Sequence, residues 1–230
     1  MPFTAPQGAL PSLTIDCTIF GFIDFRLKIL LVKRDIEPKR GTWALPGGWI
    51  GRAESLDDAA QRILLEATGL DDIYMDQFRV FGRLDRFPIE RLITIGYTAL
   101  INPDAYPNLT HGPEVSEVRW FDVDSIPELT FDHNEIVESA LRNLKDKAKL
   151  EPISFELLPH KFTLPQIRSL YESILGEELD RRNFRRKILS MGILEKLPEK
   201  QKGVAHRAPQ LYQFDKENYR RTHRGLVLDF

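Results

Sequence analysis

The sequence contains a single cysteine, Cys17, and no long run of apolar residues. One cysteine cannot form an intramolecular disulfide or a cysteine-rich zinc site, so we expect a protein of a reducing compartment. No stretch reaches the roughly 18 uncharged apolar residues that a membrane-spanning helix needs. The opening segment MPFTAPQGALPS lacks the basic flank and apolar core of a secretory signal. These absences predict a cytoplasmic protein without a membrane partner.

Charge is distributed unevenly along the 230 residues, although the formal net charge is only −2. Residues 1–150 contain 17 basic and 23 acidic residues, whereas residues 151–230 contain 15 and 11. The imbalance is largest within residues 181–224, with 13 basic against 4 acidic residues. A basic segment of this kind is typical of proteins that dock on a polyanion, although a solvated basic surface gives the same count. We predict two domains, residues 1–150 and residues 151–230.

The first domain is predicted to mix helices and strands. Segments rich in β-branched and aromatic residues predict strands, and apolar residues at helical spacing predict helices. Residues 43–48 are expected to form a loop, because proline and paired glycines interrupt regular structure. Asp132 and Glu135 form the pattern of a capping box at the start of the second helix. The expected strands are residues 13–22, 27–32, 77–84, 92–101 and 117–121, and the expected helices are residues 55–68 and 132–149.

The second domain has the element order of a winged helix-turn-helix. Thr163 and Gln166 form a capping-box pattern at the start of one helix, and Asp180 is placed to cap the next. Two short strand candidates follow, separated by a long basic loop, so that two helices precede a hairpin. The expected helices are residues 162–176 and 181–191, and the expected strands are residues 193–197 and 210–214.

A spaced motif in the first domain consists of Gly48, Glu54, Arg62, Glu66 and Gly69. The spacing of these residues resembles the Nudix box. Two glutamates of that signature are replaced by Ile63 and Ala67, which are most simply core residues. Helix positions three and four residues apart are neighbours, so three carboxylates there would form an oxygen site for Mg²⁺. Only one of the three remains, so we predict a vestigial box with no catalytic residues and no required cofactor, and at most a weak Mg²⁺ site at Glu54 and Glu66.

Charged residues near the predicted strand ends form a candidate effector site. Arginine binds phosphate bidentately, a carboxylate accepts hydrogen bonds from sugar hydroxyls, and tryptophan stacks on bases and sugar faces. The same residue types also occur on ordinary surfaces and in cores. The candidate effector residues are Trp49, Arg83, Asp85, Arg86 and Arg91.

The segment DRRNFRRKIL, residues 180–189, is a candidate DNA-binding helix. Phe184 and Ile188 would anchor it to the core, while its cations would remain outside. Arginine bonds guanine edges and phosphates, and Asn183 would pair with adenine or help to cap the helix. A basic surface helix that binds another protein or acidic lipid is the alternative. The candidate DNA-binding residues are Arg181, Arg182, Asn183, Arg185, Arg186 and Lys187 in the helix and Lys200, Lys202, His206 and Arg207 in the wing.

A degenerate Nudix box followed by a winged helix resembles the Nudix-related transcriptional regulators. The stretches 131–133 (FDH), 151–153 (EPI), 162–164 (FTL) and 182–185 (RNFR) are similar to that group. Among its branches, the Bacteroidetes branch that responds to L-arabinose is the nearest and the NAD-metabolism branch is second. The resemblance implies an α+β fold, in which a Nudix-like α/β/α sandwich with a mixed sheet precedes a winged helix-turn-helix. It also implies a homodimer that binds operator DNA and a small effector, either a sugar such as L-arabinose or ADP-ribose.

The predicted function is therefore a ligand-responsive transcriptional regulator. A working Nudix hydrolase is the rival, which would cleave ADP-ribose or a related nucleoside diphosphate with Mg²⁺ and use the C-terminal part for dimerisation. A protein-interaction scaffold is a third possibility and predicts neither activity. An assay of DNA binding and an assay of hydrolysis separate the three.

Overall fold

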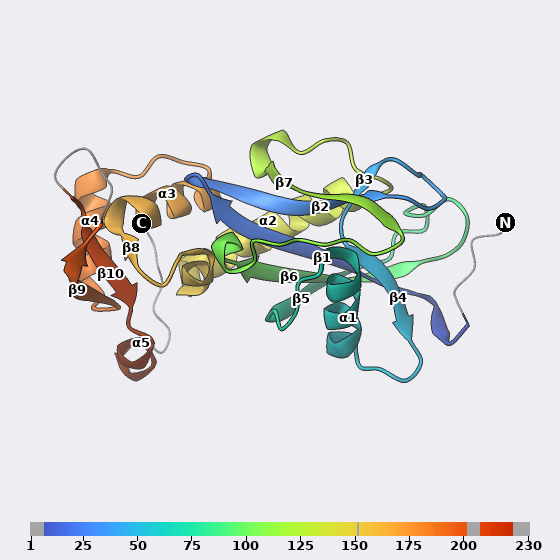
Figure 1. Ribbon diagram of the computed structural model, residues 1–230, viewed down its shortest axis with the longest axis horizontal. Coiled ribbons are helices and arrows are strands. Elements are labelled where there is room, and N and C mark those ends of the chain that lie inside the picture. The colour runs from blue at the N-terminus through green and yellow to red at the C-terminus, as the bar shows by residue number, and fades with distance from the viewer. Residues whose placement is uncertain (1–6, 151, 202–207, 223–230) are drawn as a thin grey trace. The chain divides into compact units, whose positions relative to one another are not determined.

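The computed structural model describes residues 7–150, 152–201 and 208–222. Contacts divide the chain into an N-terminal unit, Met1–Gly21 with Lys28–Asn143, and a C-terminal unit, Phe22–Leu27 with Leu144–Phe230. Figure 1 shows the elements of both units. Across the described ranges, no helix is both long enough and apolar enough to cross a membrane.

A mixed seven-stranded sheet forms the middle of the N-terminal unit. The strands follow the order β3-β2-β1-β6-β5, with β4 paired to β1 and β7 paired to β2. β1 runs parallel to β6 and antiparallel to β4, which makes the sheet mixed. The strands are β1 (Ala9–Ile23), β2 (Arg26–Arg34), β3 (Trp43–Ala44), β4 (Gly47–Gly51), β5 (Met75–Phe81), β6 (Ile93–Ile101) and β7 (Val115–Asp122), with short 3₁₀ turns at Pro103–Ala105 and Val123–Ser125.

Helices α1 (Leu56–Thr68) and α2 (His133–Leu150) cover opposite faces of this sheet (Figure 1). Side chains alternate between the two faces of a strand. Along β1, Ile15 and Ile19 pack into one core cluster with Leu64 of α1, whereas Asp16 points to the other face and contacts His133 at the start of α2. The α/β/α sandwich that the sequence predicts is confirmed.

The C-terminal unit is a winged helix. Its three-stranded antiparallel sheet has the order β8-β10-β9. The predicted capping box of Thr163 and Gln166 is present, and Asp180 caps the next helix through the backbone N–H of Asn183 at 2.8 Å. Its elements are η3 (Pro152–Leu157), β8 (Phe162–Thr163), α3 (Leu164–Leu175), α4 (Arg181–Ser190), β9 (Leu194–Lys200), β10 (Gln210–Phe214) and α5 (Lys216–Thr222).

Three local predictions from the sequence were wrong. The segment 43–48 is not a loop throughout, because it contains β3 and the start of β4. A Cβ at Gly47 would lie 2.8 Å from the backbone oxygen of Ile15, so glycine is what allows β4 to approach β1. The strand expected at 77–84 covers Met75–Phe81, and β7 begins at Val115, two residues before the strand expected at 117–121. α5 and the short β8 were not predicted at all.

The prediction of a capping box at the start of α2 is also wrong. Asp132 instead accepts hydrogen bonds from Arg86 at both carboxylate oxygens, each at 2.9 Å. Glu135 accepts a hydrogen bond from Nη1 of Arg83 at 3.1 Å. Both carboxylates therefore connect α2 to the segment before β6, a long-range contact that the local pattern does not reveal.

Candidate functional site

Arg62 connects α1 to β4 in the remnant of the Nudix box. Its Nη2 and Nε donate to the two carboxylate oxygens of Glu54 at 2.6 and 2.9 Å, and its Nη1 donates to Glu66 at 3.1 Å. Nη2 also donates to the carbonyl oxygen of Trp49 at 2.9 Å. The hydrogen bond from Arg62 holds the pKa of Glu54 below its ordinary value, with the Gly51 backbone N–H adding to the effect against the opposing desolvation. The box thus persists as a hydrogen-bonded brace.

Apolar contacts replace the missing carboxylates. Ile63 is buried in the core cluster of the sheet, and a Cβ at Gly48 would lie 3.1 Å from its Cγ1. Ala67 packs against a second cluster that contains Val32 and Ala44. The interpretation of Ile63 as a core residue is confirmed, whereas Ala67 is partly buried at the edge of the second cluster.

The donor set does not fit a Mg²⁺ site of the Nudix type. Such a site needs several carboxylate oxygens directed at one point, whereas Glu54 and Glu66 are both bound to Arg62. In the part of the chain that the structure describes, no three His, Cys, Asp or Glu side chains are grouped to hold a metal ion. In the described part of the chain, the surviving carboxylates of the box are therefore engaged by Arg62 and do not converge on one point.

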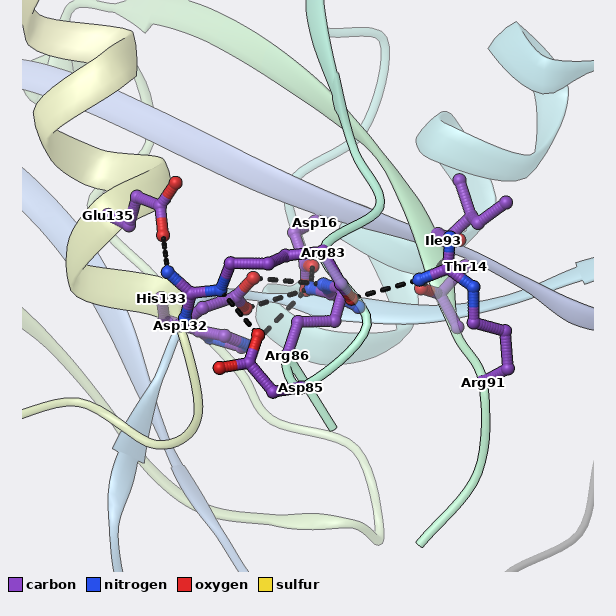
Figure 2. A network of polar contacts seen from close by, with 10 residues as sticks. All are labelled: Thr14, Asp16, Arg83, Asp85, Arg86, Arg91, Ile93, Asp132, His133 and Glu135. Atoms are coloured by element: carbon purple, nitrogen blue, oxygen red, sulfur yellow. Dashed lines mark hydrogen bonds and ion pairs between the residues drawn. The ribbon is translucent and has the colours of Figure 1, made fainter. Parts of the chain in front are cut away.

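A buried polar network joins Arg86, Asp16, Asp132 and His133 (Figure 2). The Arg86 guanidinium binds Asp132 bidentately and reaches Asp16 at 3.4 Å. Nε2 of His133 lies 3.6 Å from the same Asp16, while its Nδ1 accepts a hydrogen bond from the backbone N–H of Leu45 at 3.0 Å. The network ties β1, α2 and the loop before β4 together.

The four other candidate effector residues are more accessible. Figure 2 shows Arg83 between Asp85 and Glu135, with nitrogen–oxygen distances of 2.7 and 3.1 Å. Arg91 donates to the carbonyl oxygen of Arg83 at 2.9 Å. β1 pairs with β4 at Trp49 and with β6 at Ile93, so β4 and the segment before β6 flank the same end of β1. The structure brings the candidate residues to one end of the sheet.

Arg86 differs from the rest of this set. Only 5% of its side chain is exposed, against 59% for Arg83. The guanidinium of Arg86 already binds the carboxylates of Asp132 and Asp16. This geometry gives Arg86 a role in positioning the site. Sequence reasoning missed Asp16 and Asp132 as its partners, because they lie 70 and 46 positions away and no local pattern joins them to Arg86.

The folded environment favours the neutral form of His133. Burial lowers the pKa of its imidazole below the ordinary 6.5, and the positive charges of Arg86 and Arg34 act in the same direction. The negative charges of Asp16 and Asp132 oppose this shift without cancelling it. The unprotonated Nδ1 is also what accepts the Leu45 N–H, so protonation at that nitrogen would break the contact.

Acidification should destabilise the protein through His133. Since its folded pKa lies below the unfolded value of about 6.5, the unfolded chain gains the proton first as the pH falls. The stabilising contribution is complete above about pH 6.5 and is lost as the pH falls through the folded pKa. We expect urea titrations to show a steeper loss of unfolding free energy on acidification for the wild type than for His133→Asn, which keeps an acceptor near Leu45 but cannot titrate. Parallel pH profiles would contradict this role.

In the C-terminal unit, α4 combines a buried anchor with an exposed cationic face. Phe184 and Ile188 are buried, and the ring of Phe184 lies 6.0 Å from that of Tyr171 on α3. Within the described ranges, the exposed side chains of Arg181, Arg182 and Arg185 form no ion pair. Positive charge left uncompensated on a capped helix is available to a polyanion.

Comparison with known proteins agrees with both parts of the structure. A family model described as the NUDIX domain matches residues 14–144, and one described as the NrtR DNA-binding winged helix domain matches residues 154–214. The chain is 34% identical over 211 residues to the "ADPR responsive transcriptional repressor NtrR" of Acinetobacter baylyi, covering 91% of this chain and 84% of that protein. The chain belongs to the NrtR family of Nudix-related transcriptional regulators.

Solved structures of NrtR from Shewanella oneidensis are similar to this NrtR-family chain. The structure in complex with a 27mer DNA has a TM-score of 0.75 and 32% identity, covering 88% of this chain and 93% of that one. The NUDIX domain in complex with ADP ribose has a TM-score of 0.54 and 34% identity, covering 57% of this chain and 87% of that one. These matches are to NrtR proteins, and they lend no support to the L-arabinose effector that the sequence resemblance favoured.

The structure places most of the predicted DNA-binding residues of this NrtR-family chain on or beside α4. Six of them lie on α4 itself, where Lys187 is half-buried and the others are exposed. Lys200 is exposed at the end of β9. Lys202, His206 and Arg207 lie outside the described residues.

Proposed function

We propose that this chain is an ADP-ribose-responsive transcriptional repressor that binds operator DNA through α4. The observation that carries the proposal is the uncompensated arginine face of α4, on a helix followed by the β9–β10 hairpin of a winged helix. The winged-helix and Nudix matches, together with the relatives described as binding DNA and ADP-ribose, support it. We also propose residues 1–150 and 151–230 as its two domains.

The proposed effector site uses Trp49, Arg83, Asp85 and Arg91. ADP-ribose carries a diphosphate, two sugars and a base, which match arginine, carboxylate and aromatic side chains respectively. The ion pairs of Arg83 are exposed and therefore contribute at most about 1 kcal/mol each. Arg83 can exchange them for phosphate oxygens at little cost, whereas the buried Arg86 cannot.

We propose that the effector is bound without being cleaved. Ile63 and Ala67 occupy the positions of two carboxylates, and the remaining pair is bound to Arg62. The alternative, a Mg²⁺-dependent hydrolase, predicts release of AMP from ADP-ribose. We further propose a homodimer, because a single winged helix makes few DNA contacts and two-fold symmetry doubles them.

ADP-ribose and operator DNA should alter each other's affinity by the same factor. Allosteric coupling free energies are commonly about 1–3 kcal/mol, which corresponds to about 5- to 150-fold in affinity. The measurement is fluorescence anisotropy of the full chain with a labelled duplex selected from a randomised library, titrated with and without ADP-ribose. Calorimetric titration of ADP-ribose, with and without the duplex, gives the reciprocal factor.

L-arabinose is the matched control ligand and should leave the DNA affinity unchanged. The same ADP-ribose samples, incubated with Mg²⁺ and separated by chromatography, should contain no AMP. Rapid release of AMP, together with no binding to any DNA duplex, would instead establish the hydrolase function.

A further inference from the structure

The exposed face of α4 has a defined centre. Two positions along an α-helix correspond to about 200° of rotation. Arg186 lies two residues after the buried Phe184 and two residues before the buried Ile188, so it leaves the helix opposite the buried stripe. When such a face enters a major groove, its central side chain reaches the base edges, while flanking cations such as Arg182 reach the phosphates.

Asn183 fixes the guanidinium at this centre. Nη2 of Arg186 donates a hydrogen bond to Oδ1 of Asn183 at 3.0 Å. The backbone N–H of Asn183 in turn donates to the helix-capping carboxylate of Asp180 at 2.8 Å. A bidentate contact of asparagine with adenine requires the same amide oxygen as an acceptor. Here that oxygen is directed at Arg186, which argues against Asn183 as the adenine reader considered from the sequence.

We propose that Asn183 is a positioning residue that presents Arg186 to a guanine in each operator half-site. The proposal rests on the proposed function, because it requires α4 to bind DNA. The planar guanidinium has five N–H donors, so the bond to Asn183 leaves enough of them for the O6 and N7 acceptors of guanine. A side chain that is already held loses less rotamer freedom on binding. Asn183 therefore determines base specificity through Arg186 without touching a base itself.

The test measures discrimination rather than affinity alone. The full-length wild type first selects its preferred duplex from a randomised library, and each guanine is then replaced by adenine in turn. At the guanine read by Arg186, we expect the wild type to discriminate about 10- to 100-fold, and Arg186→Ala to abolish this preference. Asn183→Ala should reduce the same discrimination about tenfold. Its helix cap survives, because Asp180 binds the backbone N–H of residue 183.

Three further variants separate positioning from a structural role. Asn183→Asp keeps an oxygen acceptor and should restore the guanine preference, even though its charge weakens binding to every duplex. Arg185→Ala, an exposed α4 arginine off the centre of the face, should weaken binding to all duplexes equally. In the Arg186→Ala background, Asn183→Ala should change discrimination no further.

Two results would overturn the inference and leave the proposed function standing. One is that Asn183→Ala discriminates guanine from adenine as strongly as the wild type does. The other is that Asn183→Ala loses discrimination only at an adenine position of the operator. Failure of the wild type to bind any duplex at low salt would overturn the proposed function, and this inference with it.

Discussion

Replacing Arg182 and Arg186 together by alanine should weaken binding to the selected operator duplex at least about 100-fold. A bidentate guanine contact contributes about 1–3 kcal/mol, and a lost phosphate contact adds to this. Each phosphate contact also releases counterions, so the slope of log affinity against log salt should become shallower by about 0.9 for each Arg182, which is about 1.8 for the proposed homodimer. Anisotropy titrations at several salt concentrations measure both effects.

The double variant should remain folded. The anchor residues Phe184 and Ile188 are unchanged, and alanine is the residue with the highest helix propensity. The matched control is Arg40→Ala with Arg142→Ala, which removes the same charge from two side chains that are each 62% exposed in the N-terminal unit. The control should bind the duplex almost as the wild type does. Equal losses in the two double variants would mean that net charge, rather than α4, governs binding.

The features that could be predicted from the sequence are those that depend on residues close together in the chain. The helix cap at Thr163 and Gln166 is a pattern of neighbouring residues, and it is present as expected. Ile63 and Ala67 follow the apolar spacing of α1, so the packing of both residues on the sheet side of that helix could be anticipated from the sequence. Likewise, the separation of buried apolar residues from exposed arginines on α4 follows from the period of the helix alone.

Features that depend on distant partners could not be predicted. Gly47 and Gly48 fit a loop by sequence alone, because nothing near them in the chain indicates that β1 lies against them. Arg86 has the same residue type and the same segment as Arg83, yet one is buried between two carboxylates and the other is exposed. That difference is set by Asp16 on β1 and Asp132 before α2, which the chain brings together only on folding.

Arg86→Met should cost about 3–5 kcal/mol of unfolding free energy, because it leaves the buried carboxylates of Asp16 and Asp132 without their counter-charge. In a chain of this size, such a loss lowers the melting temperature by roughly 6–20 °C. Arg83→Met is the matched control: it removes an arginine with two carboxylate partners from the same segment, and its exposed ion pairs should cost less than about 1 kcal/mol each. Urea titration and thermal melts of both variants give the comparison.

A second substitution tests whether the cost comes from the unpaired charge. In the Arg86→Met background, Asp132→Asn removes one buried charge and should recover part of the stability, whereas in the wild type the same change breaks a bidentate pair and should destabilise. The sign of the Asp132→Asn effect therefore reverses between the two backgrounds. Equal losses for Arg86→Met and Arg83→Met, or the same sign in both backgrounds, would mean that the Arg86 network does not brace the proposed effector site.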